Sequence, residues 1–249
     1  MDTSTAPERS ASADSNTLSA SVMCADFRQL GAQLKALRRG GVHRAHLDFG
    51  DGRFVANLPL GVEVFSQLPP RTDWVRECHL MVETPQKLLQ LFAPQSDMVI
   101  FHLEADVDPV EFVASIRHAG CKVGVALNPG TPPQRIIPVV ASVDEILVMA
   151  VTPGFAGGGF IPEIVDKVRQ IRTIADRARP GVVIEVDGAV SAKTIPALVE
   201  AGADRFVGGT SGLFVGQDLE VSARALIGCI ELARGETRRH STVDLEESR

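Results

Sequence analysis

Two histidines and two aspartates stand at positions where they could bind one metal ion together. His46 and Asp48 lie two residues apart near the end of an apolar run, and a Gly-Asp-Gly turn follows at once. His79 and Asp187 lie near the ends of two further runs of this kind. Imidazole nitrogens and carboxylate oxygens are common ligands of zinc and of more oxygen-preferring divalent ions. Each residue alone has an ordinary alternative, such as a hydrogen-bonded core histidine or an aspartate that caps a turn.

Glycine-rich segments form the second group of candidate functional residues. The stretch GGTSG at 208–212 and the stretch DGA at 187–189 each follow an apolar run, and so does PGFAGG at 153–158. Backbone N–H groups of such loops can bind phosphate, and a glycine-rich loop can close over a substrate. The alternative is that these glycines only allow the chain to turn.

The elements that would position these residues follow an alternating pattern. Eight short apolar runs predict strands at 17–23, 42–49, 74–82, 97–104, 122–128, 145–151, 182–188 and 204–210. Between them, stretches such as 26–41 and 161–178 repeat apolar residues at helical spacing. Eight strand–helix units predict a single-domain (β/α)8 TIM barrel. A doubly wound open sheet is the alternative, but it usually has fewer strands, and no GxGxxG follows the first run.

Alternation within the strands predicts that the polar candidates face the barrel interior. In the run 42–49, His46 and Asp48 share one face and Leu47 lies on the other. His79 and Asp187 have the same relation to their apolar neighbours. Because barrel enzymes build their active sites at the carboxyl ends of the strands, we expect the four residues to converge there.

Composition restricts the partners and the compartment. The net charge is −6 with no basic block, which argues against nucleic acid and anionic membranes. No apolar run is long enough to cross a membrane. The four cysteines have no paired spacing, which predicts reduced thiols in a cytoplasmic protein. Residues 1–16 and 235–249 are polar and are predicted to be disordered tails around a barrel at 17–234.

Several motifs, in order, resemble those of the ribulose-phosphate 3-epimerases and their relatives. The resemblance covers about residues 18–215 and becomes specific because the motifs occur as a series. The motifs are S-x-M-C-A-D (21–26), H-L-D-F-G-D-G-R-F-V-A-N-L (46–58), H-L-M-V (79–82), L-N-P-G-T-P (127–132), M-A-V-T-P-G-F-A-G (149–157), F-I-P-E (160–163), E-V-D-G (185–188) and G-T-S-G-L-F (209–214).

The resemblance implies a metal-dependent epimerase that inverts C3 of a small phosphorylated 2-ketose through an enediolate. By position, His46, Asp48, His79 and Asp187 would hold one divalent ion, zinc first, with manganese, iron or cobalt as alternatives. Asp48 and Asp187 would also be the acid/base pair. The positions that would bind the substrate are Ser21, Met81, Met149, Gly154, Gly157, Gly188, Gly209, Thr210 and Ser211. The resemblance also implies a homo-oligomer.

Four positions depart from the family pattern: Ala56 replaces a usual proline, Ala189 replaces a frequent glycine, and Gly50 and Gly158 are the other two. The family usually has methionine at Gly50 and glutamine at Gly158. A glycine at 50 predicts a side-chain-sized gap beside Asp48.

Three functions remain open. The first is interconversion of D-ribulose 5-phosphate and D-xylulose 5-phosphate. The second is D-allulose 6-phosphate 3-epimerisation to D-fructose 6-phosphate, indicated by the Met-Cys pair after Ser21 and by G-T-S-G-L-F. The third is a weakly active barrel that binds a sugar phosphate. Only the departures at Gly50 and Gly158 support the third, and the intact His/Asp set opposes it.

Overall fold

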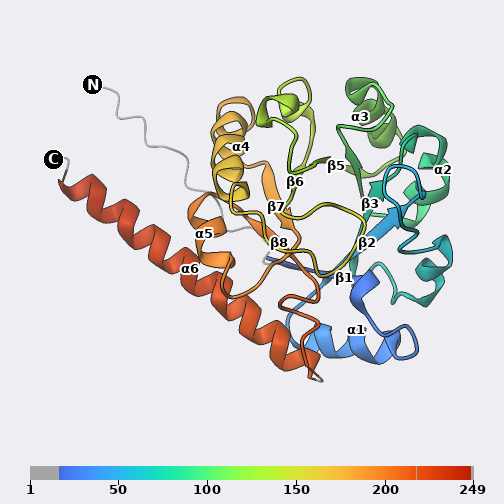
Figure 1. Ribbon diagram of the computed structural model, residues 1–249, viewed down its shortest axis with the longest axis horizontal. Helices are drawn as coiled ribbons and strands as arrows, with labels where there is room; N and C mark the ends of the chain where they lie inside the picture. Colours follow the sequence, from blue (N-terminus) through green and yellow to red (C-terminus); the bar gives the residue numbers. More distant parts are fainter. Residues whose placement is uncertain (1–16, 217, 248–249) are drawn as a thin grey trace.

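Eight parallel strands form a closed barrel, which confirms the predicted single-domain (β/α)8 TIM barrel and excludes the open sheet. The computed structural model describes residues 17–216 and 218–247, with the backbone alone from 236 onward. Each strand pairs with its neighbour in sequence, and β8 closes the barrel against β1 (Figure 1). The strands are β1 (Leu18–Ser21), β2 (Arg44–Gly50), β3 (Val75–Met81), β4 (Met98–His102), β5 (Lys122–Leu127), β6 (Glu145–Met149), β7 (Val183–Asp187) and β8 (Arg205–Gly208).

The helical layer is less regular than the strands. Its α-helices are α1 (Leu30–Arg39), α2 (Leu89–Phe92), α3 (Pro109–His118), α4 (Ile164–Ala178), α5 (Ile195–Glu200) and α6 (Leu219–Glu247). After β2 and β5 the described chain forms only short 3₁₀ turns, at Val62–Gln67, Pro133–Ile136 and Val140–Ser142. Prolines at 132, 133 and 138 lack the N–H that a helix interior needs, which explains the second gap.

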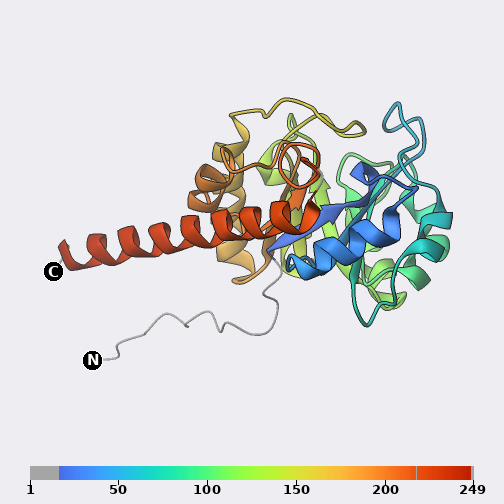
Figure 2. The ribbon, with the colours of Figure 1, turned by 90° about the horizontal axis from the view of Figure 1, so that it is seen from below.

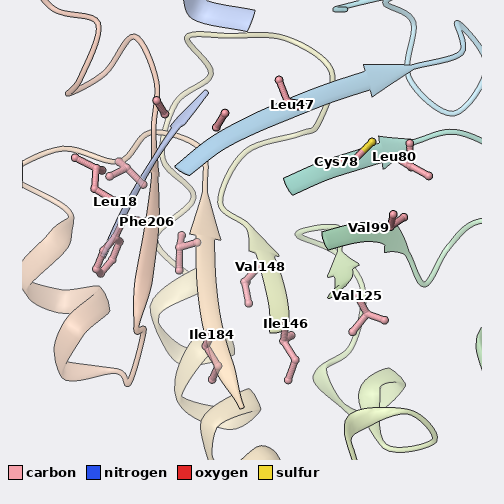
Figure 3. Close-up of a cluster of buried hydrophobic side chains, with 14 of the residues drawn as sticks. Leu18, Leu47, Cys78, Leu80, Val99, Val125, Ile146, Val148, Ile184 and Phe206 are labelled. Atoms are coloured by element: carbon pink, nitrogen blue, oxygen red, sulfur yellow. The ribbon is translucent and has the colours of Figure 1, made fainter. Parts of the chain in front are cut away.

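The hydrophobic core lies mainly between the barrel and its helices. Outward-facing strand residues such as Leu47, Val125 and Ile184 are fully buried, and they alternate along each strand with residues that face the interior. Figure 3 shows side chains of this outer layer, from Leu18 on β1 to Phe206 on β8. A smaller apolar group, which includes Met98, Ile100 and Met149, packs inside the barrel.

Helix α6 packs against α1 and α5 and continues past them. Its buried residues Leu226, Ile230 and Ala233 face the barrel, and Figure 2 shows its C-terminal part extending away from the other elements. The predicted tail boundary at residue 235 does not coincide with a change in the backbone, which stays helical to Glu247. The segment lacks apolar periodicity but contains good helix formers, such as glutamate and arginine. The predicted tail at 1–16 lies outside the described residues.

In the part of the chain that the structure describes, no helix has both the length and the apolar character needed to cross a membrane.

Candidate active site at the carboxyl ends of the strands

A cavity opens at the carboxyl end of the barrel and holds about 520 Å³ of space, including solvent at its mouth. The predicted site residues on its wall are Ser21, Asp48, Met81, Met149, Gly154, Gly157, Asp187, Gly188, Gly209, Thr210 and Ser211. The structure therefore brings together segments that are up to 190 residues apart in the sequence, from Ser21 to Ser211.

The four candidate metal ligands converge at this end of the barrel: Asp48 and Asp187 line the cavity, and His46 and His79 are fully buried beside them. One ligand atom from each of His46, Asp48, His79 and Asp187 lies within 4.8 Å of the others. His46 Nε2 is 3.3 Å from Asp48 Oδ1 and 3.8 Å from Asp187 Oδ2. His79 Nδ1 is 3.0 Å from Asp48 Oδ1. Two imidazoles and two carboxylates at this proximity fit a single divalent ion in number and chemical type.

The remaining hydrogen bonds of this cluster come from buried neighbours. Ser21 Oγ donates to Asp48 Oδ2 at 3.0 Å, so the second carboxylate oxygen is also held. His79 Nε2 lies 2.9 Å from His102 Nε2, and His102 Nδ1 lies 3.2 Å from Glu104 Oε2. These distances favour hydrogen bonds from His79 Nε2–H to His102 Nε2 and from His102 Nδ1–H to Glu104. His79 Nδ1 then carries no proton and can bind an ion.

Two supporting carboxylates were not among the sequence-predicted site residues. Glu104 accepts from His102, and Glu77 accepts from His46 Nδ1 at 3.0 Å. Glu77 shares the inward face of β3 with His79, which is the one sequence signal that could have identified it.

The two aspartates experience opposite electrostatic effects. Burial raises the pKa of Asp48, but the charge and hydrogen bond of His46 outweigh it, so the pKa lies well below its usual value. Burial raises the pKa of Asp187 to about 7, against the opposing attraction of His46. Two carboxyl groups with separated pKa values can serve as base and acid at the same pH.

The pKa values of the two histidines are also shifted in opposite directions. Burial lowers the pKa of His46, but the negative charge of Asp48 outweighs burial and raises the pKa well above its usual value. Burial lowers the pKa of His79 to about 4, although its hydrogen bond to Asp48 opposes the change. A bound cation would favour the neutral form of both rings, since metal ligands must be deprotonated.

Comparison with known proteins identifies the family of this site. A sequence model of the Ribulose-phosphate 3 epimerase family matches residues 17–214. The ribulose-phosphate 3-epimerase of Mycobacterium bovis is 38% identical over 192 residues, which cover 77% of this chain and 83% of that protein. The chain belongs to this family. The Bacillus subtilis relative is 37% identical, covering 77% of this chain and 89% of its own, and Cupriavidus necator ribulose-phosphate 3-epimerase 1 is 40% identical, covering 78% and 83%.

Solved structures of other families share the fold. The orotidine 5'-phosphate decarboxylase of Pyrococcus horikoshii superposes with a TM-score of 0.60 at 15% identity, covering 86% of this chain and 99% of that chain. The phosphoribosyl anthranilate isomerase of Thermus thermophilus gives a TM-score of 0.61 at 12% identity, covering 87% and 99%. Likeness at these identities shows the barrel architecture alone.

The departure from the epimerase family at Gly50 does not leave a gap, so the sequence-based expectation there is wrong. A Cβ atom at Gly50 would lie 2.7 Å from Val55 Cγ2, 2.7 Å from the Asn57 carbonyl oxygen and 2.9 Å from Pro59 Cδ. The loop that follows β2 therefore folds back onto Gly50. The sequence could not show this packing because it depends on the loop conformation.

The same loop holds the glycine-rich segment after β6. Asn57 Nδ2 donates to the Gly154 carbonyl oxygen at 2.6 Å. Gly154 has φ +103, and a Cβ there would lie 2.8 Å from Val55 Cβ, so only glycine fits this contact. The segment after β6 thus forms one wall of the cavity and is fixed by the loop after β2.

The far end of the cavity offers backbone groups and hydroxyls. Gly188, with φ +107, lies against Val151, where a Cβ would be only 2.5 Å from the valine side chain. Thr210 and Ser211 line the opposite part of this end. Among the described residues on the cavity wall there is no lysine or arginine, so an anion here would be held by N–H and O–H donors.

Proposed function

We propose that the protein is a metal-dependent ketose-phosphate 3-epimerase that interconverts D-ribulose 5-phosphate and D-xylulose 5-phosphate. The observation that carries the proposal is the convergence of His46, Asp48, His79 and Asp187 at the carboxyl end of the barrel, beside a cavity with a phosphate-compatible far end. The relatives that share 34–40% of its residues are named ribulose-phosphate 3-epimerase, which favours the pentulose as substrate.

The chemistry requires removal of a proton from C3 and its return to the opposite face. One side chain cannot readily reach both faces, so two carboxyl groups on different strands suit the task. Asp48 on β2 and Asp187 on β7 approach from strands that β1 and β8 separate. We assign one face of C3 to each aspartate. A divalent cation in the site would stabilise the negative charge that develops on the substrate oxygens.

The other cavity residues would orient the sugar. Met81 and Met149 end β3 and β6 and are almost fully buried, so they would form an apolar wall beside the reacting carbon. Ser21 would contact a sugar hydroxyl. The loops that contain Gly154 and Gly157 would exclude water, and Gly188, Gly209, Thr210 and Ser211 would bind the phosphate.

A parallel assay tests the proposed substrate. The purified protein, loaded with zinc, manganese, iron or cobalt, is offered ribulose 5-phosphate and allulose 6-phosphate under the same conditions. We expect a higher kcat/KM with ribulose 5-phosphate, and loss of activity after chelation that added metal restores. A preference for allulose 6-phosphate would replace the pentulose assignment, and turnover of neither sugar would refute the enzyme assignment.

We also propose a cytoplasmic location and a homo-oligomeric state. All four cysteines are free thiols in the structure, which supports a reducing compartment. Large apolar side chains exposed on loops around the cavity support association with a second copy of the chain.

A further inference from the structure

The interior of the barrel below the candidate metal site is ionic. Arg44, Glu77, Glu145, Glu185 and Arg205 are all fully or almost fully buried there. Barrel interiors are usually filled by bulky branched apolar residues, because buried charge is costly to desolvate. Because burying these charges costs desolvation free energy, we ask what function they serve in the barrel.

Arg44 and Glu77 form the part of this network that reaches the metal site. Arg44 Nε and one of its terminal nitrogens donate to Glu77 Oε2 at 3.0 and 2.6 Å. Arginine stays charged at any ordinary pH, so this pairing holds Glu77 as a carboxylate. Both donors go to one oxygen, which leaves the other oxygen, Oε1, for a different partner.

That partner is a candidate metal ligand. Glu77 Oε1 lies 3.0 Å from His46 Nδ1. A carboxylate only accepts hydrogen bonds, so Nδ1 must carry a proton, and in the neutral ring that a cation requires Nε2 then presents its lone pair. Nε2 is the atom that faces Asp48 and Asp187 across the site. The contact therefore selects both the tautomer and the orientation of His46.

The same atoms could instead ligate a second cation, since His46, Glu77 and Glu185 also offer atoms within 4.8 Å of one another. Two features oppose this. Arg44 already occupies Glu77 Oε2, and Ser19 Oγ donates to Glu185 Oε1 at 2.7 Å. The arginine charge beside the group would also repel a cation.

We propose that Glu77, held by Arg44, is a positioning residue that fixes His46 with Nε2 toward the metal site and thereby strengthens metal binding. The inference rests on the proposed metal site but not on the identity of the sugar. Partners of this kind in other metal sites contribute about 10–100-fold to metal affinity.

The test measures metal binding without substrate. Metal-free wild type and Glu77→Gln are titrated with Co²⁺ in competition with a chromophoric chelator, and the Co²⁺ absorption spectrum is recorded. Glutamine keeps the size of the side chain, but its amide can donate as well as accept, so it no longer enforces the Nδ1–H tautomer. We expect the Kd to rise by about 10–100-fold with an altered spectrum.

Glu145→Gln is the matched control. Glu145 is equally buried and pairs with Arg205; its Oε2 also lies 3.8 Å from Arg44, beyond hydrogen-bond distance, whereas Glu77 Oε2 lies 2.6 Å from Arg44, and no described contact joins Glu145 directly to a candidate ligand. We expect its melting temperature to fall while its Co²⁺ affinity and spectrum stay as in wild type. If Glu145→Gln weakens binding as much as Glu77→Gln, general loosening of the barrel is the cause and the proposal is wrong.

Further outcomes separate the possible failures. If wild type binds no Co²⁺, the proposed metal site fails. If wild type binds and a folded Glu77→Gln binds equally well, the positioning role fails. If Glu77→Gln loses one of two bound ions, Glu77 is a ligand and the proposal is overturned. If leaving Arg44 unpaired prevents folding, the double variant Arg44→Met, Glu77→Leu removes both charges together, and it should fold yet bind Co²⁺ weakly.

Discussion

At the scale of single residues, Asp48 and Asp187 have the same carboxyl group but different surroundings. Asp48 accepts from Ser21 and lies beside both histidines, whereas Asp187 lies 3.8 Å from His46 and has its pKa raised to about 7 by burial. If each aspartate transfers a proton at one face of C3, a variant that lacks one aspartate should still exchange the C3 proton at the face served by the other.

Asp187→Asn and Asp48→Asn test this division. Each should lower epimerisation by about 10²–10⁴-fold, because asparagine keeps an oxygen but cannot act as a base. Each variant should still exchange the C3 proton of one epimer with deuterated solvent, and the two variants should prefer opposite epimers, as followed by NMR. Metal content is measured in both. A metal-bound variant that epimerises at the normal rate would contradict the two-carboxylate mechanism.

Gly50 carries a second prediction at this scale. A single added methyl group would meet backbone and side-chain atoms of the loop after β2 at less than 3 Å. We expect Gly50→Ala to lower the free energy of unfolding by about 1–3 kcal/mol, because overpacking forces the loop to shift. Gly50→Met should shift the loop further and raise, rather than lower, the KM for ribulose 5-phosphate.

Gly31 provides the control for this prediction. It lies in α1, and a Cβ there would meet no atom within 4 Å. Gly31→Ala should therefore stabilise the protein by about 0.5–1 kcal/mol, as expected for alanine in a helix. Chemical denaturation measures the free energy of unfolding of both variants. Equal changes at the two positions would show that the loop after β2 moves away from an added methyl group at no energetic cost.

The sequence could predict the individual candidate ligands but not the residues that hydrogen-bond to them. His46 and Asp48 stand out because polar residues near a strand end need a reason to be buried. Glu77 looks like any other alternating polar residue until the barrel places it 3.0 Å from His46. The packing of Val55 on Gly50 depends on the path of an irregular loop, which has no periodic signal.

At the scale of elements, the strands were predictable and the helices only partly so. Short apolar runs mark all eight strands, and period-two alternation is clear in strands such as β2, whereas β4 and β6 are apolar on both faces. The connection after β5 forms only 3₁₀ turns because its prolines cannot sustain a helix. The polar composition after residue 235 predicts a tail, whereas the backbone stays helical to Glu247, because a helix without apolar periodicity leaves no clear signal in the sequence.

One buried lysine of helix α4 contacts the loop after β5. Lys167 Nζ donates to the carbonyl oxygens of Asn128 and Pro129, and burial lowers its pKa to about 8 against the attraction of Glu104. Between pH 8 and the ordinary lysine value of 10.5, the unfolded chain holds a proton that the folded chain has lost. The Lys167 contribution to stability therefore rises with pH across this window.

Lys167→Met should reveal this dependence. The free energy of unfolding of wild type relative to the variant should increase by about 1–2 kcal/mol from pH 8 to 10.5, after allowance for solvent screening. Denaturant melts at several pH values measure it. Lys122→Met, at an exposed position that begins β5, is the control and should show no such change. Parallel curves for wild type and Lys167→Met would contradict the buried-lysine account.

At the scale of the whole molecule, several large apolar side chains are exposed at the cavity end of the barrel, in addition to others on the outer helices such as Val221 and Leu232. Phe27, Leu58, Phe155 and Val215 are 52%, 71%, 60% and 44% exposed, and they lie on the loops after β1, β2, β6 and β8. Because the strands are parallel, these four loops emerge at the same end of the barrel. Exposed apolar side chains gathered around a site are typical of an interaction surface.

The last prediction is that this face mediates the proposed homo-oligomer. A charge placed in an apolar interface must be desolvated without a partner, so Leu58→Asp should shift the protein toward the monomer. Leu91→Asp is the matched control, because Leu91 is 51% exposed on α2 rather than on a loop at the cavity end. Sedimentation velocity over a range of concentrations measures both. We expect at least a tenfold weaker association constant for Leu58→Asp and an unchanged one for Leu91→Asp, since about 1.4 kcal/mol of lost association energy gives a tenfold change. Equal association of wild type and Leu58→Asp would place the interface elsewhere, and a monomeric wild type would remove the oligomer itself.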